Sequence, residues 1–242
     1  MRTLWVLILT VAAAWPVLAN EAQIRKVLEP KLGGAKIEGV GPGPISGLWE
    51  VRVRTQGGLR ILYTNATGTH VIDGNIHEVS TNRDLTEERL RKLNAIKFES
   101  LPLDLAVKVQ RGNGRRVLAM FSDPYCPACR QFERTLAEVD DVTIYVFMYP
   151  VIRPENVDHS RAVWCSPDRA KAWLELAAAS QPKVPDAPKN CANPVDKVVD
   201  VGHKLGVNST PTLFFANGER VAGGLRLNDL KEMLDRTATA RR

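Results

Sequence analysis

Two cysteines separated by two residues are the most reactive feature of the sequence, Cys126-Pro-Ala-Cys129. The apolar run before them, residues 117–121, predicts a buried strand, and the apolar spacing from Ala128 onward predicts a helix. At a helix start, unpaired backbone N–H groups and the positive end of the helix dipole favour a thiolate over a thiol. A thiolate is the attacking species in thiol–disulfide exchange, and the short spacer lets the second sulfur resolve a mixed disulfide formed by the first. The motif predicts a redox-active dithiol.

The same cysteine spacing also occurs in zinc sites, so the rest of the chain has to separate the two chemistries. A four-cysteine zinc site usually has a second close pair, whereas Cys165 and Cys191 lie far apart in the sequence. None of the histidines lies at ligand spacing from the motif or offers a nearby base for a cysteine protease: His70, His77, His159 and His203. We therefore expect no metal, no cofactor and no protease activity.

The first 19 residues have the pattern of a secretory signal peptide. Arg2 gives a positive start, residues 4–18 are apolar, and Val17-Leu-Ala19 is a small-residue cleavage signal. An uncleaved membrane anchor is the alternative, which Pro16 and the short apolar run disfavour. The sequence therefore predicts an exported protein.

Export would place the cysteines in an oxidising compartment, where disulfides persist. Of the three possible pairings, only a structural bridge between Cys165 and Cys191 leaves Cys126 and Cys129 free to cycle, so we expect that bridge. The formal charge of +6 comes from scattered basic residues. Scattered charge is typical of a solvated surface and predicts no nucleic-acid partner.

Residues 20–80 predict a small N-terminal domain with a helix over 21–32 and a Gly/Pro-rich loop over 39–47. Short segments separated by turn signals then predict an antiparallel meander of strands: residues 48–54, 59–64, 69–72 and 76–79. So few residues bury little apolar surface, and pairing of an exposed edge strand across a two-fold axis would relieve that. We therefore expect a dimerisation domain.

Residues 81–100 predict a linker, formed by a helix over 84–98 with acidic residues at its start and basic residues toward its end. Such a helix would hold two domains at a set distance. The alternative is that it packs on the second domain.

Residues 101–242 predict a second domain in the order strand, strand, helix, strand, helical region, hairpin and helix. The strand before the hairpin follows Thr210-Pro211. We expect this peptide bond to be cis and to bring the Thr210 backbone against the Cys126 sulfur. An ordinary trans proline at a strand edge is the alternative. The helical region, residues 155–205, would be an insertion that contains Cys165 and Cys191.

This combination of motifs resembles the periplasmic disulfide isomerases of the DsbC/DsbG type across essentially the whole mature chain. The resemblance implies an α+β fold: a thioredoxin-like domain with a helical insertion, preceded by a small cystatin-like dimerisation domain and a linker helix. It also implies a periplasmic homodimer with chaperone activity, misfolded exported proteins as substrates, and a membrane electron donor of the DsbD type.

Carried over to this sequence, the resemblance makes Cys126 the nucleophile and Cys129 the resolving thiol. Thr210 and Pro211 would form the substrate-binding loop opposite, and Cys165 and Cys191 the structural disulfide. Two departures matter. The dipeptide between the active cysteines is Pro127-Ala128 rather than the Gly-Tyr of the best-known isomerase, and Met120 stands where thioredoxins bury an aspartate that assists proton transfer.

The leading functional hypothesis is a protein disulfide isomerase or reductase that acts on non-native disulfides. Two alternatives remain open. Proline at the first position between the cysteines also occurs in oxidants, so the chain could donate its disulfide as a thiol oxidase. A redox-inert periplasmic chaperone is the other class, and it would suppress aggregation equally well without its two active cysteines.

Overall fold

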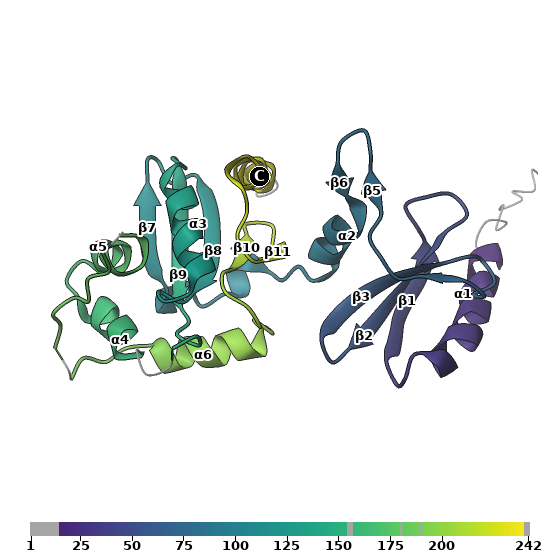
Figure 1. The fold of residues 1–242 in the computed structure, drawn as a ribbon, viewed down its shortest axis with the longest axis horizontal. Helices are drawn as coiled ribbons and strands as arrows, with labels where there is room; N and C mark the ends of the chain where they lie inside the picture. Colours follow the sequence, from purple (N-terminus) through teal and green to yellow (C-terminus); the bar gives the residue numbers. More distant parts are fainter. Residues whose placement is uncertain (1–14, 154–156, 180, 189, 240–242) are drawn as a thin grey trace, which may run out of the picture. The chain divides into compact units, whose positions relative to one another are not determined.

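The computed structural model describes residues 15–153, 157–179, 181–188 and 190–239. The chain divides into two compact units, Met1–Leu93 and Asn94–Arg242, whose elements are labelled in Figure 1. Most of the predicted signal peptide lies outside the described residues. In the described part of the chain, no helix is long and apolar enough to cross a membrane.

The first unit contains a four-stranded antiparallel sheet, and helix α1 packs against it (Figure 1). Its strands lie in the order β1-β2-β3-β4. Strands β2, β3 and β4 confirm three strands of the predicted meander, but the predicted strand over residues 76–79 lies outside this sheet. Ile24 and Leu28 of the helix join apolar strand residues in one core cluster. The elements are α1 (Trp15–Leu28), a 3₁₀ turn (Glu29–Lys31), β1 (Lys36–Pro42), β2 (Trp49–Thr55), β3 (Gly58–Thr64) and β4 (Val71–Ile72).

Strand β1 corrects the first part of the loop expected over residues 39–47, because residues 39–42 belong to the strand and residues 43–47 form the loop. Glycine weakens a strand because it has no side chain to pack, so the glycines here suggested a loop. The structure gives Gly39 a different role: a Cβ at this position would lie 1.9 Å from Nη2 of Arg52 on the neighbouring strand. The strand forms because Ile37 and Val40 are buried, and the glycine at position 39 lets the Arg52 guanidinium lie close to the backbone of β1.

The helix predicted over residues 84–98 is shorter than expected. A two-stranded ribbon of β5 (His77–Glu78) and β6 (Arg83–Asp84) leads into α2 (Leu85–Leu93), which packs on β3 and β5 of its own unit. Residues beyond α2 belong to the second unit, where Phe98 is 2% exposed. Helix α2 therefore ends at Leu93, where the first unit ends, and the segment 81–100 does not form one continuous helix.

The second unit is built on a five-stranded sheet in the order β11-β10-β8-β9-β7. Strands β8 and β9 are parallel, and the other neighbours are antiparallel. This is the β-α-β half followed by a hairpin that the sequence predicted for a thioredoxin-like domain. The strands are β7 (Val107–Arg111), β8 (Arg116–Ser122), β9 (Val142–Met148), β10 (Thr212–Phe215) and β11 (Arg220–Ala222).

Helices cover both faces of this sheet. Helix α3 (Pro127–Ala137) and helix α7 (Leu227–Thr239) contribute to the core cluster on one face, and α6 (Val195–Lys204) contributes Val198 to the cluster on the other. Strand β8 contributes side chains to both clusters, because alternate side chains of a strand point to opposite faces of the sheet. Leu118 and Met120 lie in the cluster with α3, and Ala119 and Phe121 lie in the other.

The insertion between the halves is only partly helical, which corrects the prediction of a helical region over residues 155–205. Helix α4 (Val157–Cys165) and helix α5 (Arg169–Trp173) are followed by a π-helical turn (Leu174–Ala178). The described residues between that turn and α6 are irregular. Three prolines explain this, because proline lacks the N–H that a helix interior needs: Pro182, Pro185 and Pro188.

Candidate functional site

The dithiol lies where β8 passes into α3. Cys126 is the N-cap residue of α3, and Pro127 follows at the first helical position, where a missing N–H costs nothing. Cys129 lies in the first turn, on the buried face that continues through Phe132 and Leu136. Cys126 is 6% exposed and Cys129 is 0% exposed. The two sulfurs therefore differ in access, and only Cys126 reaches the surface.

The loop before β10 lies against Cys126. The Thr210–Pro211 peptide bond is cis, as the sequence predicted. The Cys126 thiol donates a hydrogen bond to the backbone oxygen of Thr210 at 3.3 Å. Sheet register explains the meeting, because Thr212 pairs with Phe121 at the end of β8. Segments 84 residues apart in the sequence thus face each other at the ends of two neighbouring strands.

Burial dominates the chemistry of Cys129. It raises the pKa of this thiol to about 12, because a buried thiolate loses its hydration. Three nearby groups favour the thiolate and so lower the pKa against the effect of burial: the hydroxyl of Ser122, the backbone N–H of Asp123 and the hydroxyl of Thr210. The charge of Cys126 raises it further. Cys129 is therefore a thiol at neutral pH in the reduced state.

Asp123 fixes the turn that carries the dithiol. Its buried carboxylate accepts a hydrogen bond from the Tyr125 N–H at 2.7 Å and another from the Ile152 N–H at 2.8 Å. The Asp123 carbonyl oxygen accepts from the Cys126 N–H at 3.1 Å. Sequence analysis missed this residue, although an aspartate two residues before a turn N–H is a known local signal.

A histidine lies closer to the dithiol than the sequence suggested. The phenol of Tyr125, the residue before Cys126, hydrogen-bonds Nδ1 of His159 on α4, and the Arg153 guanidinium lies 5.9 Å from the centre of the Tyr125 ring. Burial raises the pKa of the Tyr125 phenol, and the Asp123 charge adds to the shift. His159 binds the tyrosine rather than a thiol, so this contact positions the loop and gives no protease-like pair.

The other two cysteines form a disulfide between the end of α4 and the irregular segment before α6. The Cys165–Cys191 S–S distance is 2.03 Å and the Cα–Cα distance is 5.9 Å. Cys126 and Cys129 are both free thiols. Among the residues that the structure describes, no group of three or more His, Cys, Asp or Glu side chains could hold a metal ion.

A buried carboxyl lies one turn along α3 from Cys129. Glu133 is 2% exposed, and it accepts a hydrogen bond from Nε1 of Trp173 at 2.8 Å. Burial raises the pKa of Glu133 to about 7, against the lowering effects of the Trp173 bond and the Arg111 charge. Sequence analysis did not single out Glu133, because its burial depends on the insertion that supplies Trp173.

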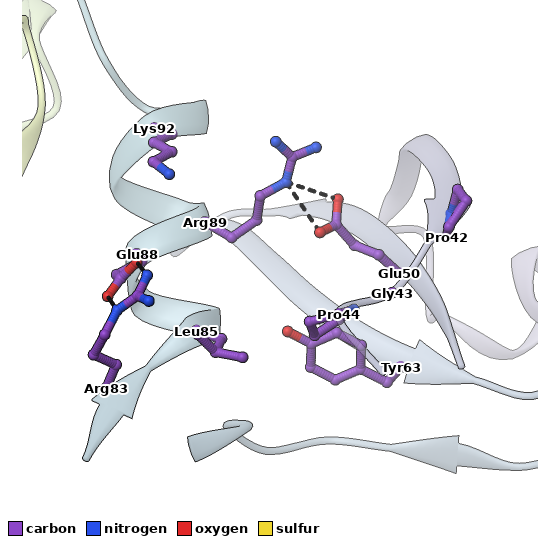
Figure 2. Close-up of a pocket in the computed structure, with 10 residues that line it drawn as sticks. All are labelled: Pro42, Gly43, Pro44, Glu50, Tyr63, Arg83, Leu85, Glu88, Arg89 and Lys92. Carbon is purple, nitrogen blue, oxygen red and sulfur yellow. Dashed lines mark hydrogen bonds and ion pairs between the residues drawn. The ribbon is translucent and has the colours of Figure 1, made fainter. Parts of the chain in front are cut away.

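The first unit holds a cavity of about 320 Å³ between its sheet and α2, shown in Figure 2. Figure 2 shows the Arg89 guanidinium pointing at the Glu50 carboxylate, and the Nε–Oε2 distance of this pair is 3.0 Å. Arg83 and Glu88 form a second ion pair on the cavity wall. Because these opposite charges satisfy each other, the cavity wall serves to fasten α2 to the sheet.

Two family models match the chain. The model described as "Thioredoxin-like domain" matches residues 103–238, and "Disulfide bond isomerase protein N-terminal domain" matches residues 16–87. The "Probable thiol:disulfide interchange protein DsbC" of Bordetella avium is 40% identical over 219 residues, which cover 89% of this chain and 75% of that protein. This chain belongs to the DsbC family.

Other DsbC proteins match over different shares of their length. The Bordetella pertussis protein is 42% identical over 188 residues, or 78% of this chain, and the chain spans only 65% of that relative. The Escherichia coli protein is 27% identical over 229 residues, which cover 90% of this chain and 88% of that protein. A disulfide interchange protein from Neisseria gonorrhoeae gives a TM-score of 0.53 at 37% identity, covering 57% of this chain and 99% of the solved one.

Proposed function

We propose that this chain is a thiol:disulfide interchange enzyme that isomerises or reduces non-native disulfides in exported proteins. One observation carries the proposal: a free Cys126 thiol at the N-terminus of α3 lies 3.3 Å from the Thr210 carbonyl, beside a cis proline. A helix N-terminus stabilises the thiolate form that attacks a disulfide. Membership of the DsbC family supports the same activity.

In this proposal Cys126 is the nucleophile. Its thiolate attacks one sulfur of a substrate disulfide, forms a mixed disulfide and releases the other substrate sulfur as a thiolate. Two exits follow. A substrate thiolate can attack the mixed disulfide, which frees Cys126 and leaves a rearranged substrate bridge. Alternatively Cys129 attacks Cys126, which leaves the substrate reduced and the enzyme dithiol oxidised by two electrons.

Thr210 and Pro211 are proposed to bind the substrate segment next to the disulfide. Proline has no N–H, and the cis bond turns the chain so that the Thr210 backbone faces the Cys126 sulfur. An extended substrate strand can pair with the Thr210 backbone there, as strands add to an exposed sheet edge. The Cys165–Cys191 disulfide is proposed to be structural, because it ties the insertion together away from this loop.

We also propose a periplasmic homodimer joined through the first unit, with chaperone activity and a membrane electron donor of the DsbD type. The predicted signal peptide supports export. Strand β4 supports the dimer, because it lies at an edge of the sheet and both of its apolar residues are exposed, Val71 by 46% and Ile72 by 52%. An edge strand with exposed apolar side chains is suited to pairing across a two-fold axis.

The test of activity is the recovery of a scrambled multi-disulfide protein. We expect Cys126→Ala to abolish recovery, and Cys129→Ala to keep isomerisation while losing net reduction. Full activity of Cys126→Ala would contradict the proposal. Sedimentation of the full chain and of a shortened chain starting at Asn94 tests the dimer, with a monomer expected for the shortened chain.

Pro127 favours one alternative, a thiol oxidase, since proline at this position also occurs in oxidants. Direction is tested by trapping the redox state in cells with a thiol-alkylating reagent. A mostly reduced dithiol fits an isomerase supplied with electrons, and a mostly oxidised dithiol fits an oxidase.

A further inference from the structure

Two hydroxyl groups beside the dithiol are buried and make no hydrogen bond within the part of the chain that the structure describes. They are Ser122 Oγ and Thr210 Oγ1. Ser122 as a whole is 0% exposed. A buried polar atom without a partner costs free energy and is rare in folded proteins. Two such atoms next to one reactive sulfur point to a partner that exists only during the reaction.

Strand geometry aims Ser122 at Cys129. Side chains alternate along β8, and Met120, two residues earlier, lies in the core cluster that α3 covers. Ser122 ends β8 and therefore points to the same face as Met120, one pleat closer to the dithiol. Cys129 lies on the buried face of α3 together with Phe132, which belongs to that cluster.

Thr210, on the cis-proline loop, also lies beside the dithiol. Its carbonyl oxygen accepts a hydrogen bond from the Cys126 thiol. Its hydroxyl, like that of Ser122, lowers the pKa of Cys129. The backbone N–H of Asp123 is the third donor that favours the Cys129 thiolate. The thiolate would thus be surrounded by hydrogen-bond donors from the end of β8 and from the cis-proline loop.

We propose that the hydroxyls of Ser122 and Thr210 donate hydrogen bonds to the Cys129 thiolate and so set the rate at which Cys129 resolves the mixed disulfide. The proposal deepens the proposed function and rests on it. It gives the two hydroxyls the part of an anion hole: donors fixed in advance where negative charge develops.

The resolving step balances without a further reactant. Cys129 loses its proton to water, and its thiolate attacks Cys126 Sγ. The bond between Cys126 and the substrate sulfur breaks while the Cys126–Cys129 bond forms. The substrate sulfur leaves as a thiolate and takes up a proton, so the dithiol is oxidised and the substrate disulfide is reduced by two electrons.

Other groups near α3 serve this role less well. Met120 is apolar and cannot donate. The Glu133 carboxyl is bound to the indole of Trp173 on the insertion, one turn further along the helix. The two hydroxyls are therefore the side chains placed to act on Cys129 directly.

The size of the effect follows from two opposing trends. A hydrogen bond to a charged acceptor shifts an ionisation by about tenfold or more. A thiolate also becomes less nucleophilic as its pKa falls, with a Brønsted slope of about 0.5, so about half of the logarithmic effect remains in the rate. We expect loss of one hydroxyl to slow the resolving step by about threefold, and loss of both by about tenfold.

The experiment follows the reaction of the reduced full-length protein with oxidised glutathione, by quenched flow and mass spectrometry. The first step forms a mixed disulfide at Cys126, and the second releases glutathione and closes the Cys126–Cys129 bridge. We expect Ser122→Ala and Thr210→Val to slow the second step more than the first, so that the mixed disulfide accumulates. Thr210→Ser keeps the hydroxyl and should restore most of the second-step rate that Thr210→Val loses.

Thr237→Val is the matched control, because Thr237 is buried and its hydroxyl donates to the Leu234 carbonyl within α7. It should leave both steps unchanged. An unaltered second step in the Ser122→Ala/Thr210→Val double variant, or equal slowing of both steps, would overturn the inference. Failure of the unaltered chain to form any mixed disulfide would instead overturn the proposed function.

Discussion

The two units bury apolar surface in different ways. The first has a single small core cluster between α1 and one face of its sheet, whereas the second encloses its sheet between two clusters. Both residues of β4 are exposed at the edge of the first sheet, but the residues of β8 from Leu118 to Ser122 are all buried.

This difference matches a difference in chemistry. All four cysteines lie in the second unit, and the two free ones follow the end of β8, a strand that is packed on both faces. A dithiol whose donors must be held within hydrogen-bond reach needs such a rigid support. The first unit positions no reactive group in its described residues, and its exposed edge fits the role of association.

Phe98 tests where the second unit begins. The sequence placed that start at residue 101, but Phe98 is 2% exposed in the second core. We expect Phe98→Ala to lower the free energy of unfolding of the second unit by about 3–5 kcal/mol, as large-to-small core changes do. Denaturant unfolding measures this. Val79→Ala, at a side chain that is 95% exposed in the first unit, should have no measurable effect; equal effects of the two changes would contradict the boundary.

The disulfide gives a second test of the difference between the units, because only the second unit contains one. The bridge closes a loop of 26 residues, and the chain-entropy relation gives about 3.5 kcal/mol for such a loop. We expect the double variant Cys165→Ala/Cys191→Ala to lose about that much stability in the second unit, measured by denaturant unfolding. Unfolding of the first unit should not change, and a loss shared by both units would argue against their independence.

Glu133 makes the stability of the second unit depend on pH. Its pKa is about 7 when folded and close to 4.5 when unfolded, so the folded state binds the proton more tightly. The resulting stabilisation is fully present below about pH 4.5 and is lost as the pH rises through about 7. The shift corresponds to about 3 kcal/mol. Glu133→Gln keeps an acceptor for Trp173 but cannot ionise. We therefore expect the stability of the variant to rise relative to that of the unaltered chain as the pH increases from 5 to 8. If the stability of the variant and that of the unaltered chain changed equally with pH, Glu133 would not be the source of the pH dependence.

The smallest expected effect concerns the charges of the first unit. Glu50 is 6% exposed, and Arg89 Nε donates to its carboxylate at 3.0 Å. We expect Glu50→Gln to destabilise the first unit by about 1–2 kcal/mol, because it weakens a charge-assisted bond at a buried acceptor. Glu38→Gln is the control: Glu38 also pairs with an arginine, Arg54, but on the surface, where ion pairs contribute little. Equal effects of the two changes would show that burial of Glu50 has no consequence.

Local patterns were enough to predict much of the fold. Alternation in β2, the turn at Asn217-Gly218 and the helical spacing after Cys126 are all properties of neighbouring residues. The cis proline was also predictable, because cis bonds are nearly confined to proline and Thr210-Pro211 starts a strand. Strand β1 was missed because glycines favour a loop in a local pattern, and the pairing with β2 that places residues 36–42 in the sheet is a contact between separate segments.

The sequence by itself determined the reactive pair, its place at a helix start and the family to which the chain belongs. The surroundings of Cys129 were decided only by the tertiary structure. Ser122 and Thr210 are distant in the sequence, and the pairing of β8 with β10 brings both to one sulfur. The pKa of a thiol depends on its burial and on the donors around it, and both are properties of packing between distant segments rather than of neighbours along the chain.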